Sequence, residues 1–411
     1  MLSDRLVRPS LLLALVALGL SVLACVSDES QEVPSEPEGP RQMALDPPAG
    51  PGAMAPNLTV GGGEVVLSWL EPDDPEAREV YRLRLARLQG ETWGAAETVV
   101  EGSNFFANWA DLPTVAQGGD GTWVTSWLEM LGEGTYAYGI QMAALGEGEW
   151  ERTGLLHADD ASPTEHGFVS SVSVPGGLQA FWLDGRGMAG DPPGPMTLRT
   201  ALVEDGVPGE STVLDEKVCE CCSTDAALTS EGPVTVYRDR SDEEIRDIGV
   251  VRAVADGWSE PVQIHDDGWK IQACPVNGPA IAALGKQVAV AWFTAPGGHP
   301  QVRLTFSTDG GTTFNEPIVL DDAEPVGRVD VEFDDEGQAW VLWLAREGDA
   351  GAIRLQKVDA SGSIGESHLV ASTSASRSAG VARLVRDGDR LLVAWVEDVK
   401  PSRIRVASVS I

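Results

Sequence analysis

A short apolar segment that ends in an aromatic residue recurs seven times along the chain, as in VVLSW, LQAFW and VAVAW. The aromatic residues that end the seven copies are Trp69, Trp127, Trp182, Tyr237, Trp292, Trp343 and Trp395. Consecutive copies are separated by 51 to 58 residues. A repeat of this period indicates an array of equivalent units, and four-stranded units in such an array are typical of a β-propeller.

The residues around each aromatic segment predict the other strands of the unit. A short apolar strand precedes it, as at 168–174 and 329–333, and a strand of alternating character follows it, as in the runs from Met196 and Ile353. A fourth strand begins near an aromatic turn at Trp93, Trp150, Trp258 and Phe314. Period-two alternation bounded by Gly, Asp and Pro is a strand signature. We therefore expect an all-β propeller of seven four-stranded blades, or of six if one copy is misread.

The last copy of the pattern has three strands, and the third runs up to Ile411. An unpaired outer strand leaves backbone donors and acceptors exposed at the edge of the sheet. The beginning of the domain can supply the missing strand and close the ring. The segment from Gln42 to Leu45 is the candidate.

The first residues have the pattern of an export signal. Arg5 and Arg8 precede an apolar run at 11–20, which is short for a membrane span, and the run leads to Ala24 and Cys25. A small residue followed by cysteine at this point resembles the lipobox of bacterial lipoproteins. The resemblance implies cleavage before Cys25 and a diacylglycerol thioether on its sulfur. The alternative is an ordinary signal peptide with an incidental cysteine.

Residues 26–56 include seven prolines and almost no large apolar side chains. Such a segment cannot bury enough surface to offset its ordering entropy, so it predicts a tether. We expect a signal peptide at 1–24, the lipidated cysteine and tether at 25–56, and the propeller at 57–411. This organisation predicts a lipid-anchored protein of the cell envelope, either periplasmic or exposed at the surface.

The formal net charge of −34 argues against one class of partner. DNA, RNA and anionic lipid surfaces repel so acidic a chain. We therefore expect no nucleic-acid partner and no membrane contact beyond the lipid anchor. The charge also favours solubility outside the cytoplasm, and we expect a monomer.

One turn carries a recognisable motif. Its residues Ser307, Asp309, Gly311, Thr313 and Phe314 fit the pattern S-x-D-x-G-x-T-F. This pattern resembles the Asp box of the sialidase-like (BNR repeat) propellers, which lies between the third and fourth strands of a blade. Glycine supplies a positive φ, the aspartate accepts backbone N–H groups, and the aromatic residue anchors the hairpin. The resemblance implies the fold, because Asp boxes are structural and lie away from the active site.

The sialidases of that family use three arginines on the substrate carboxylate, a tyrosine nucleophile with a glutamate partner, and an aspartic acid. The first arginine lies in a Phe-Arg-Ile-Pro segment, and this sequence contains no such segment. Its four tyrosines all precede the last blades, where the family places the nucleophile; they are Tyr81, Tyr136, Tyr138 and Tyr237. We therefore assign no catalytic residues, since activity does not follow from fold.

Propeller geometry brings two sets of loops to one mouth of the central channel: those before the innermost strands and those between second and third strands. The residues of these loops that we expect to bind a ligand are Arg186, Arg238, Asp239, Arg240, Arg328, Arg377, His166 and Asp184. Guanidinium groups bind carboxylate, sulfate or phosphate with bidentate geometry. The alternative is that the arginines pair internally with Asp184, Asp239 and Asp330. Glu165 and His166 are candidates for an acid and a base, although a lone histidine is more often structural.

Four cysteines belong to loops of adjacent units, namely Cys219, Cys221, Cys222 and Cys274. In an exported chain they predict two disulfides. The alternatives are a copper or zinc site built from the same sulfurs, or free thiols. Apart from that possible metal we expect no cofactor.

The leading functional hypothesis is a binding module for an anionic carbohydrate or a similar small anion at the arginine-bearing mouth. The second hypothesis is a glycoside hydrolase of exo-sialidase type, or a lyase, with carboxylates such as Asp184 and Asp239 at the same mouth. A scaffold for protein partners is the third. Carboxyl groups about 5 to 9 Å apart would favour hydrolysis over binding.

Overall fold

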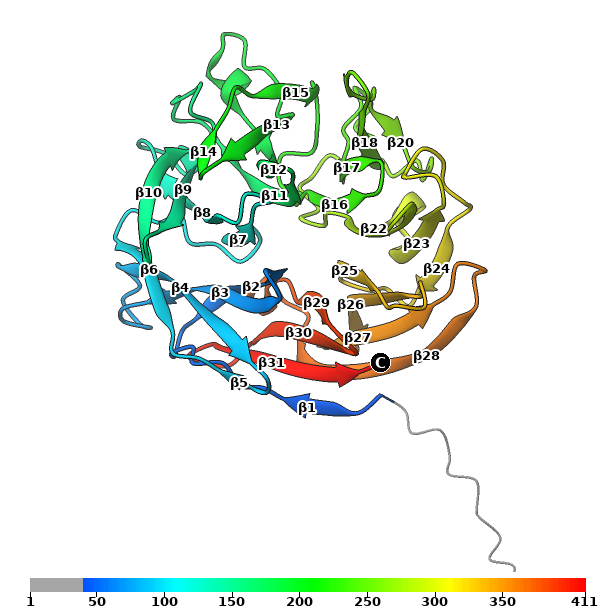
Figure 1. Cartoon of the computed structure of the whole chain (residues 1–411). Coiled ribbons are helices and arrows are strands. Elements are labelled where there is room, and N and C mark those ends of the chain that lie inside the picture. Colours follow the sequence, from blue (N-terminus) through cyan, green and yellow to red (C-terminus); the bar gives the residue numbers. More distant parts are fainter. Residues whose placement is uncertain (1–39) are drawn as a thin grey trace, which may run out of the picture. The chain divides into compact units, whose positions relative to one another are not determined.

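Each aromatic segment of the repeat forms the second strand of an antiparallel sheet, and seven sheets surround a central channel like the blades of a propeller (Figure 1). The structure is a computed structural model that describes residues 40–411. It confirms the all-β propeller with seven blades and excludes the six-bladed alternative. The predicted export signal and Cys25 lie outside the described residues.

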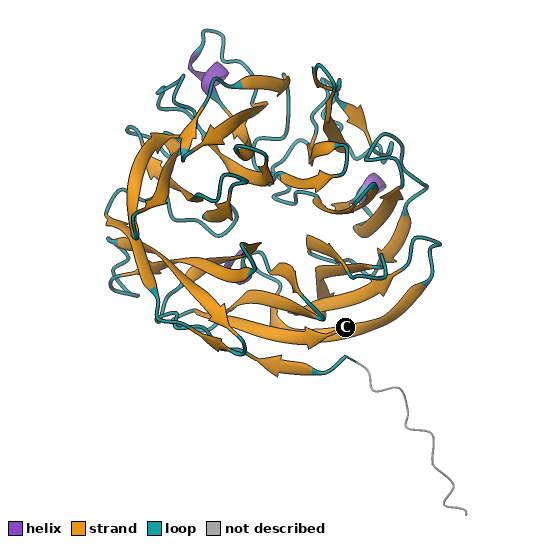
Figure 2. Cartoon of the chain, in the orientation of Figure 1, coloured by secondary structure: helices purple, strands orange, loops and turns teal. Residues whose placement is uncertain are grey.

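Strands and loops make up nearly all of the described chain (Figure 2). Its helices are short 3-10 segments, η1 (Arg186–Ala189), η2 (Pro296–Gly298) and η3 (Arg377–Ala379). None of the helices between residues 40 and 411 is long and apolar enough to cross a membrane.

The three inner strands of each blade follow one another along the chain. The innermost strands are β2 (Met54–Gly61), β7 (Thr114–Gln117), β11 (His166–Val174), β16 (Asp225–Thr229), β21 (Ala280–Leu284), β25 (Gly327–Phe333) and β29 (Arg383–Asp387). The second strands are β3 (Glu64–Pro72), β8 (Trp123–Met130), β12 (Gly177–Asp184), β17 (Gly232–Arg238), β22 (Gln287–Thr294), β26 (Ala339–Glu347) and β30 (Arg390–Glu397). The third strands are β4 (Tyr81–Gln89), β9 (Tyr138–Gly146), β13 (Thr197–Glu204), β18 (Ile248–Val254), β23 (Gln301–Ser307), β27 (Ala350–Val358) and β31 (Arg403–Ser410).

The outer strands are more variable. Four blades have a continuous outer strand, namely β10 (Glu149–Leu155), β24 (Ile318–Asp321), β28 (Ile364–Ser374) and β1 (Gln42–Ala44). In the other three blades the outer strand is split into β5 (Thr92–Trp93) and β6 (Glu97–Gly102), β14 (Val207–Pro208) and β15 (Thr212–Asp215), and β19 (Gly257–Trp258) and β20 (Val262–Gln263).

The second strands bury their aromatic residues between neighbouring blades. Trp69, Trp182 and Trp292 have no exposed surface. A buried indole N–H needs an acceptor, and in three blades the acceptor is a carboxylate two residues further along the same strand. These pairs are Trp69 with Glu71 (3.0 Å), Trp127 with Glu129 (2.9 Å) and Trp182 with Asp184 (2.9 Å). Residues i and i+2 of a strand share a face, so the acidic residue after the aromatic segment completes the core of the blade.

Polar side chains also tie the inner strands of adjacent blades together. A carboxylate or amide oxygen at one blade accepts a backbone N–H of the next in four pairs: Asp111 with Phe168 (2.7 Å), Asp225 with Ile281 (2.9 Å), Asn277 with Arg328 (2.8 Å) and Asp330 with Leu384 (2.8 Å). Buried polar groups of this kind cost free energy when left unpaired. The channel wall is therefore specified by hydrogen bonds as well as by apolar packing.

The seventh blade takes its outer strand from the beginning of the described chain. β1 pairs antiparallel with β31, so that Gln42 lies opposite Val409. The next residue, Leu45, donates its N–H to the carbonyl of Val406 (2.8 Å) and buries its side chain in the core shared by β3 and β30. The predicted closure by Gln42 to Leu45 is confirmed, and it covers the edge of β31.

The folded unit begins at Pro40, whereas composition alone placed its beginning at residue 57. The difference has a local cause, because proline-rich composition hides the few apolar residues that do pack. Leu45, Ala53 and Ala55 are all buried. The residues from Pro40 onward therefore belong to the propeller.

The turn that resembles an Asp box joins β23 to β24. Ser307 Oγ donates to Asp309 Oδ1 (2.8 Å), and the same oxygen accepts the N–H groups of Thr312 (3.1 Å) and Thr313 (2.9 Å). Gly311 has a φ of 81°, which a side chain would strain. These contacts fix the hairpin at the end of the blade opposite the mouth.

Leu45→Ala should test how far the ring depends on its closing strand. Leu45 is 4% exposed, and truncating a buried leucine costs about 2 to 5 kcal/mol of the free energy of unfolding. Urea unfolding followed by tryptophan fluorescence measures that loss. Met43→Ala, on the same strand but 39% exposed, is the control and should cost less than about 0.5 kcal/mol. Equal effects of the two variants would contradict the anchoring role of Leu45.

Candidate functional site

The loops before the innermost strands and those between second and third strands meet at one end of the channel. A cavity of about 800 Å³ is lined by residues of these loops and the adjoining strand ends. Its lining includes Arg78, Asn108, Trp109, Ser378, Asp398 and Lys400. Ligand pockets commonly measure about 300 to 1,000 Å³, so this mouth can hold a small ligand.

Arg186 and Asp184 lie together at the mouth and bind each other. Arg186 Nε and Nη2 each donate to Asp184 at 2.8 Å, and Nη1 donates to Asp159 at 2.8 Å. Burial by itself raises the pKa of Asp184, but the hydrogen bonds from Arg186 and Trp182 and the nearby charges lower it overall. This pair matches the internal-pairing alternative rather than an open anion site.

His166 is fully buried and stacks on His157, with ring centroids 3.8 Å apart. Its Nδ1 lies 2.9 Å from the carbonyl of Thr164, and its Nε2 lies 3.2 Å from Asp160 Oδ2. His157 Nε2 accepts the N–H of Ile140 (3.1 Å), and its Nδ1 contacts the carbonyl of Asp160 (2.6 Å). Each of the four ring nitrogens has a polar neighbour, and His157, Asp160 and His166 offer ligand atoms within 4.8 Å of one another, an arrangement that could hold a metal ion.

Glu165 and His166 do not act on each other, because their side chains have different partners. Glu165 Oε1 accepts the hydroxyl proton of Tyr138 at 2.6 Å. Burial raises the pKa of Glu165. The two residues are neighbours in sequence but do not form an acid–base pair here.

Arg238 donates its hydrogen bonds to backbone carbonyls of the protein. Its side chain stacks over Trp269 at 4.8 Å and donates to the carbonyls of Asn277 (2.9 Å), Arg246 (2.6 Å) and Phe293 (2.6 Å). The residue is 1% exposed. Arg238 therefore holds two blades together and presents no free donor to the mouth.

Arg240 and Asp239 have protein partners as well. Arg240 forms ion pairs with Glu220 and, at 2.7 Å, with Glu244. Asp239 accepts the N–H of Arg240 (2.6 Å) and a bond from Gln263 (3.3 Å). Burial raises the pKa of Asp239.

Arg328 and Arg377 differ from Arg186 and Arg240, which pair with carboxylates. The Arg328 guanidinium stacks over Trp109 at 4.6 Å and donates only to two carbonyls, those of Ser376 (3.0 Å) and Gly380 (2.6 Å). No carboxylate forms an ion pair with either arginine among residues 40–411. Burial and the charge of Arg377 lower the pKa of Arg328 to about 10, so it remains protonated at neutral pH. Two neighbouring cations without a counter-ion are the electrostatic feature of this mouth.

Trp109, Arg78 and Lys400 all line the large cavity, and no pattern in the sequence indicated them. Arg78 contacts the carbonyls of Pro75 (3.3 Å) and Gly52 (3.4 Å) and the sulfur of Met54 (3.9 Å), and neither it nor Lys400 is ion-paired within the described part of the chain. The strand repeat gave no signal for them, because they belong to loops whose folded paths are set by neighbouring blades.

Of the four cysteines, Cys221 and Cys274 form a disulfide, and Cys219 and Cys222 are buried thiols. The sequence led us to expect two disulfides, and the structure contains one of them. The bond links the loop before β16 to the loop before β21, and these two loops belong to adjacent blades, as the sequence predicted.

A second, smaller cavity of about 210 Å³ opens into the channel and is lined by polar side chains, including Asp111, Asp225 and Arg383. Burial, with a smaller contribution from Glu165, raises the pKa of Asp111 to about 7, although the N–H of Phe168 opposes the shift. A carboxyl group with a strongly raised pKa beside a cavity is a site where protons can be exchanged near neutrality.

Asp111→Asn should change how stability depends on pH. The pKa of Asp111 is raised from 3.8 to about 7, so its contribution is fully present below pH 3.8 and is lost as the pH rises through 7. The variant, which cannot ionise, should gain stability relative to the natural protein over this range, by at most about 4 kcal/mol. Urea unfolding between pH 4 and 8 measures the difference, with the exposed Asp389→Asn as control. A difference that does not vary with pH would contradict the raised pKa.

No family model and no curated protein matches the chain. Solved structures do match in fold. An ulvan lyase of family PL25, bound to -[GlcA(1-4)Rha3S]-, has a TM-score of 0.55 and 12% identity and covers 89% of this chain and 95% of its own. The polysaccharide lyase Uly1 has a TM-score of 0.51 and 9% identity, with 87% and 90% covered.

A neuraminidase-like protein from A/bat/Guatemala/164/2009 also matches, with a TM-score of 0.49, 10% identity and 91% of both chains covered. Identities this low concern the fold alone. The chain is a seven-bladed propeller, as its sequence repeat predicted, and its fold is similar to that of these two polysaccharide lyases.

Proposed function

We propose that the mouth of the propeller binds an anionic saccharide, with Arg328 and Arg377 holding its acidic group. The observation that carries this proposal is the pair of arginines without a carboxylate partner in a chain of net charge −34. Of the other mouth arginines, Arg186 and Arg240 pair with carboxylates, and Arg238 is buried and donates to three backbone carbonyls. A bound carboxylate or sulfate would supply the missing counter-charge through charge-assisted hydrogen bonds.

The fold itself does not require an arginine at position 328. The bulge at the start of β25 gives Arg328 a φ of 53°, and equivalent bulges in β2 and β11 give Ala55 a φ of 54° and Phe168 a φ of 56°. Alanine and phenylalanine therefore adopt the same positive φ at the equivalent bulges. The guanidinium at this bulge is a feature of the mouth, not of the blade.

The large cavity beside this pair supports a saccharide rather than a bare ion. Trp109 lines the cavity and stacks on the Arg328 guanidinium, and its ring offers an apolar face with a polar edge. Arg78 and Lys400 add positive charge to the lining, and Asn108 and Ser378 add polar groups. An apolar wall with a few placed polar groups is typical of small-molecule sites.

The acidic group that we propose is a uronic carboxylate or a sulfate ester. The ulvan lyase with the same fold is described with a ligand that contains both glucuronic acid and sulfated rhamnose. A guanidinium pair binds either group with bidentate geometry.

Binding is favoured over hydrolysis because the carboxylates that follow the aromatic segments in three blades already have protein partners. Glu71, Glu129 and Asp184 each accept an indole N–H, and Glu129 is also bound by Arg152 through two hydrogen bonds of 3.0 and 2.8 Å. Glycoside hydrolysis needs one carboxylic acid and one free carboxylate flanking the substrate.

Arg377→Gln should weaken binding of a glucuronyl-rhamnose-3-sulfate disaccharide about ten- to a hundredfold, because one charge-assisted contact of about 1.5 to 3 kcal/mol is lost. Arg377 is exposed, so its replacement leaves the core intact. Arg328→Ala, which copies Ala55, should have at least the same effect. Isothermal titration calorimetry measures both, and melting temperatures confirm folding.

Two controls accompany these variants. Lys286→Gln makes the same charge change at a residue 59% exposed in the turn between β21 and β22, at the opposite end of the blade. Cellobiose replaces the acidic disaccharide with a neutral one. Binding that is equal for both sugars, or equally reduced by Lys286→Gln, would contradict an arginine site.

We also propose that the propeller is held at the cell envelope by a lipid on Cys25, on the strength of the Ala24-Cys25 pattern. Cys25→Ser should move the protein from the membrane to the soluble fraction of the native host. An unmodified mature N-terminus by mass spectrometry would contradict the anchor.

A further inference from the structure

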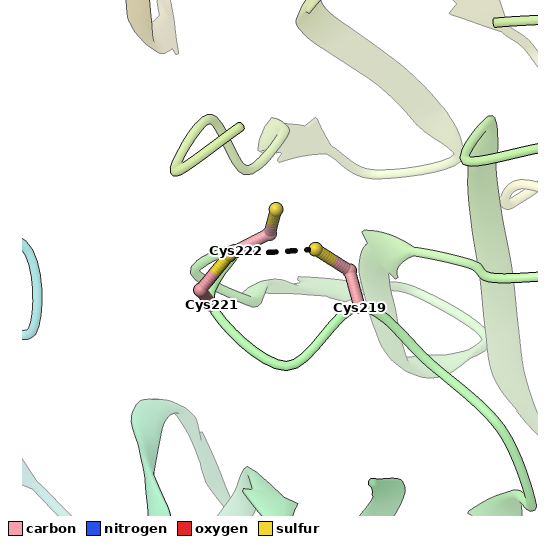
Figure 3. A group of neighbouring side chains, drawn as sticks. All are labelled: Cys219, Cys221 and Cys222. Carbon is pink, nitrogen blue, oxygen red and sulfur yellow. Dashed lines mark hydrogen bonds between the residues drawn. The ribbon is translucent and has the colours of Figure 1, made fainter. Parts of the chain in front are cut away.

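Three sulfur atoms gather on one loop of the mouth. The Sγ atoms of Cys219, Cys221 and Cys222 lie within 4.8 Å of one another (Figure 3). Cys221 is bonded to Cys274, whereas Cys219 and Cys222 are thiols. The Sγ atom of Cys219 is 3.9 Å from that of Cys221. A potential nucleophile therefore lies in contact with a disulfide.

The surroundings of Cys219 favour its thiolate form. Arg246 Nη1 donates to Cys219 Sγ at 3.3 Å. Burial by itself raises the pKa of Cys219, but hydrogen bonds from Cys222 and from the backbone N–H of Cys221, together with the charges of Arg238 and Arg246, lower it overall. The pKa of Cys222 is raised well above that of an ordinary thiol, so Cys222 remains the proton donor of the pair. Thiolates are the attacking species in thiol–disulfide exchange.

We propose that the mouth is a thiol–disulfide exchange site, in which Cys219 attacks Cys221 and releases Cys274. The Cys219–Cys221 bond forms as the Cys221–Cys274 bond breaks. The electron pair of the broken bond leaves on the Cys274 sulfur, which then takes a proton from water. The step is an isomerisation that conserves the number of thiols and disulfides, so it needs no added oxidant or reductant.

The exchange moves a reactive thiol from the interior to the surface. Cys219 and Cys222 are 0% and 1% exposed, whereas Cys274 is exposed. An external reagent cannot reach the thiols of the resting arrangement, but it can reach Cys274 once that sulfur is released. The chemical class of partner that this site takes is an external disulfide or another soft electrophile, which Cys274 would attack.

The charges around the loop accommodate both arrangements. When Cys219 enters a disulfide it loses its negative charge, and Arg246 would be left without that partner. Arg246 also pairs with Glu220 (3.1 Å) and Glu244 (3.0 Å). These two carboxylates neutralise Arg246 both before and after the exchange, so the exchange does not leave a buried charge without a partner.

The same sulfurs could instead hold a soft metal, but two contacts favour exchange. The Arg246 guanidinium donates directly to Cys219 Sγ, where it would repel a cation, and Cys221 is already bonded to Cys274. Metal content is therefore measured as an outcome that would overturn the proposal.

The full-length native protein is treated with iodoacetamide under argon, quenched in acid, and digested for mass spectrometry without reduction. We expect the label on Cys274 together with a Cys219–Cys221 disulfide. Cys219→Ser should slow labelling of Cys274 at least tenfold. The matched variant Cys222→Ser should keep Cys274 labelled and the new disulfide in place.

Several results would overturn the exchange. One is labelling of Cys219 or Cys222 while the Cys221–Cys274 bond stays intact, and another is loss of Cys274 labelling in Cys222→Ser alone. The others are a protein with two disulfides and no free thiol, and a protein with one equivalent of bound copper or zinc and unreactive thiols. The positions of the label and of the disulfide in the natural protein decide the question even if a variant does not fold. Saccharide binding plays no part in this test, so it is independent of the proposed function.

Discussion

Pairing of β1 with β31 is the constraint on which the rest of the propeller depends. The last sheet lacks an outer strand until three residues, Gln42 to Ala44, pair with β31 and complete it. Leu45 then anchors this strand in the core between the first and last blades. Closure fixes the distance between blades, and with it the positions of the loops that meet at the mouth.

Within the ring, most buried charges and polar groups serve the blades themselves. Carboxylates accept indole and backbone N–H groups, and most mouth arginines bind carboxylates or carbonyls, as Arg186 and Arg238 do. In an acidic chain this pairing is easily satisfied. Arg328 and Arg377 stand out because they lie near each other and neither forms an ion pair with a carboxylate of the described residues.

The arginine site and the cysteine loop are connected through one residue, Asn277. Asn277 Oδ1 accepts the N–H of Arg328, and its backbone carbonyl accepts a bond from Arg238, which lies near Cys219. Asn277 follows Cys274 by three residues. A change in the disulfide would therefore act on the loop that positions Arg328, so the two proposed chemistries share one structural element.

The sequence by itself determined the architecture, because period-two strands at a regular spacing can bury their apolar faces only by stacking into a ring. It located all seven aromatic strands, the closing segment and the loops of the mouth. It did not distinguish Arg328 from Arg186, since both are loop arginines near aspartates and only packing decides which carboxylate each can reach. The sequence likewise did not indicate Trp109 or Arg78, because they belong to loops without a periodic pattern. The sequence also did not show which two of the four cysteines form the disulfide or which sulfur is buried beside Arg246. These features depend on the distances and charges between loops of separate blades, and only the tertiary structure brings those loops together.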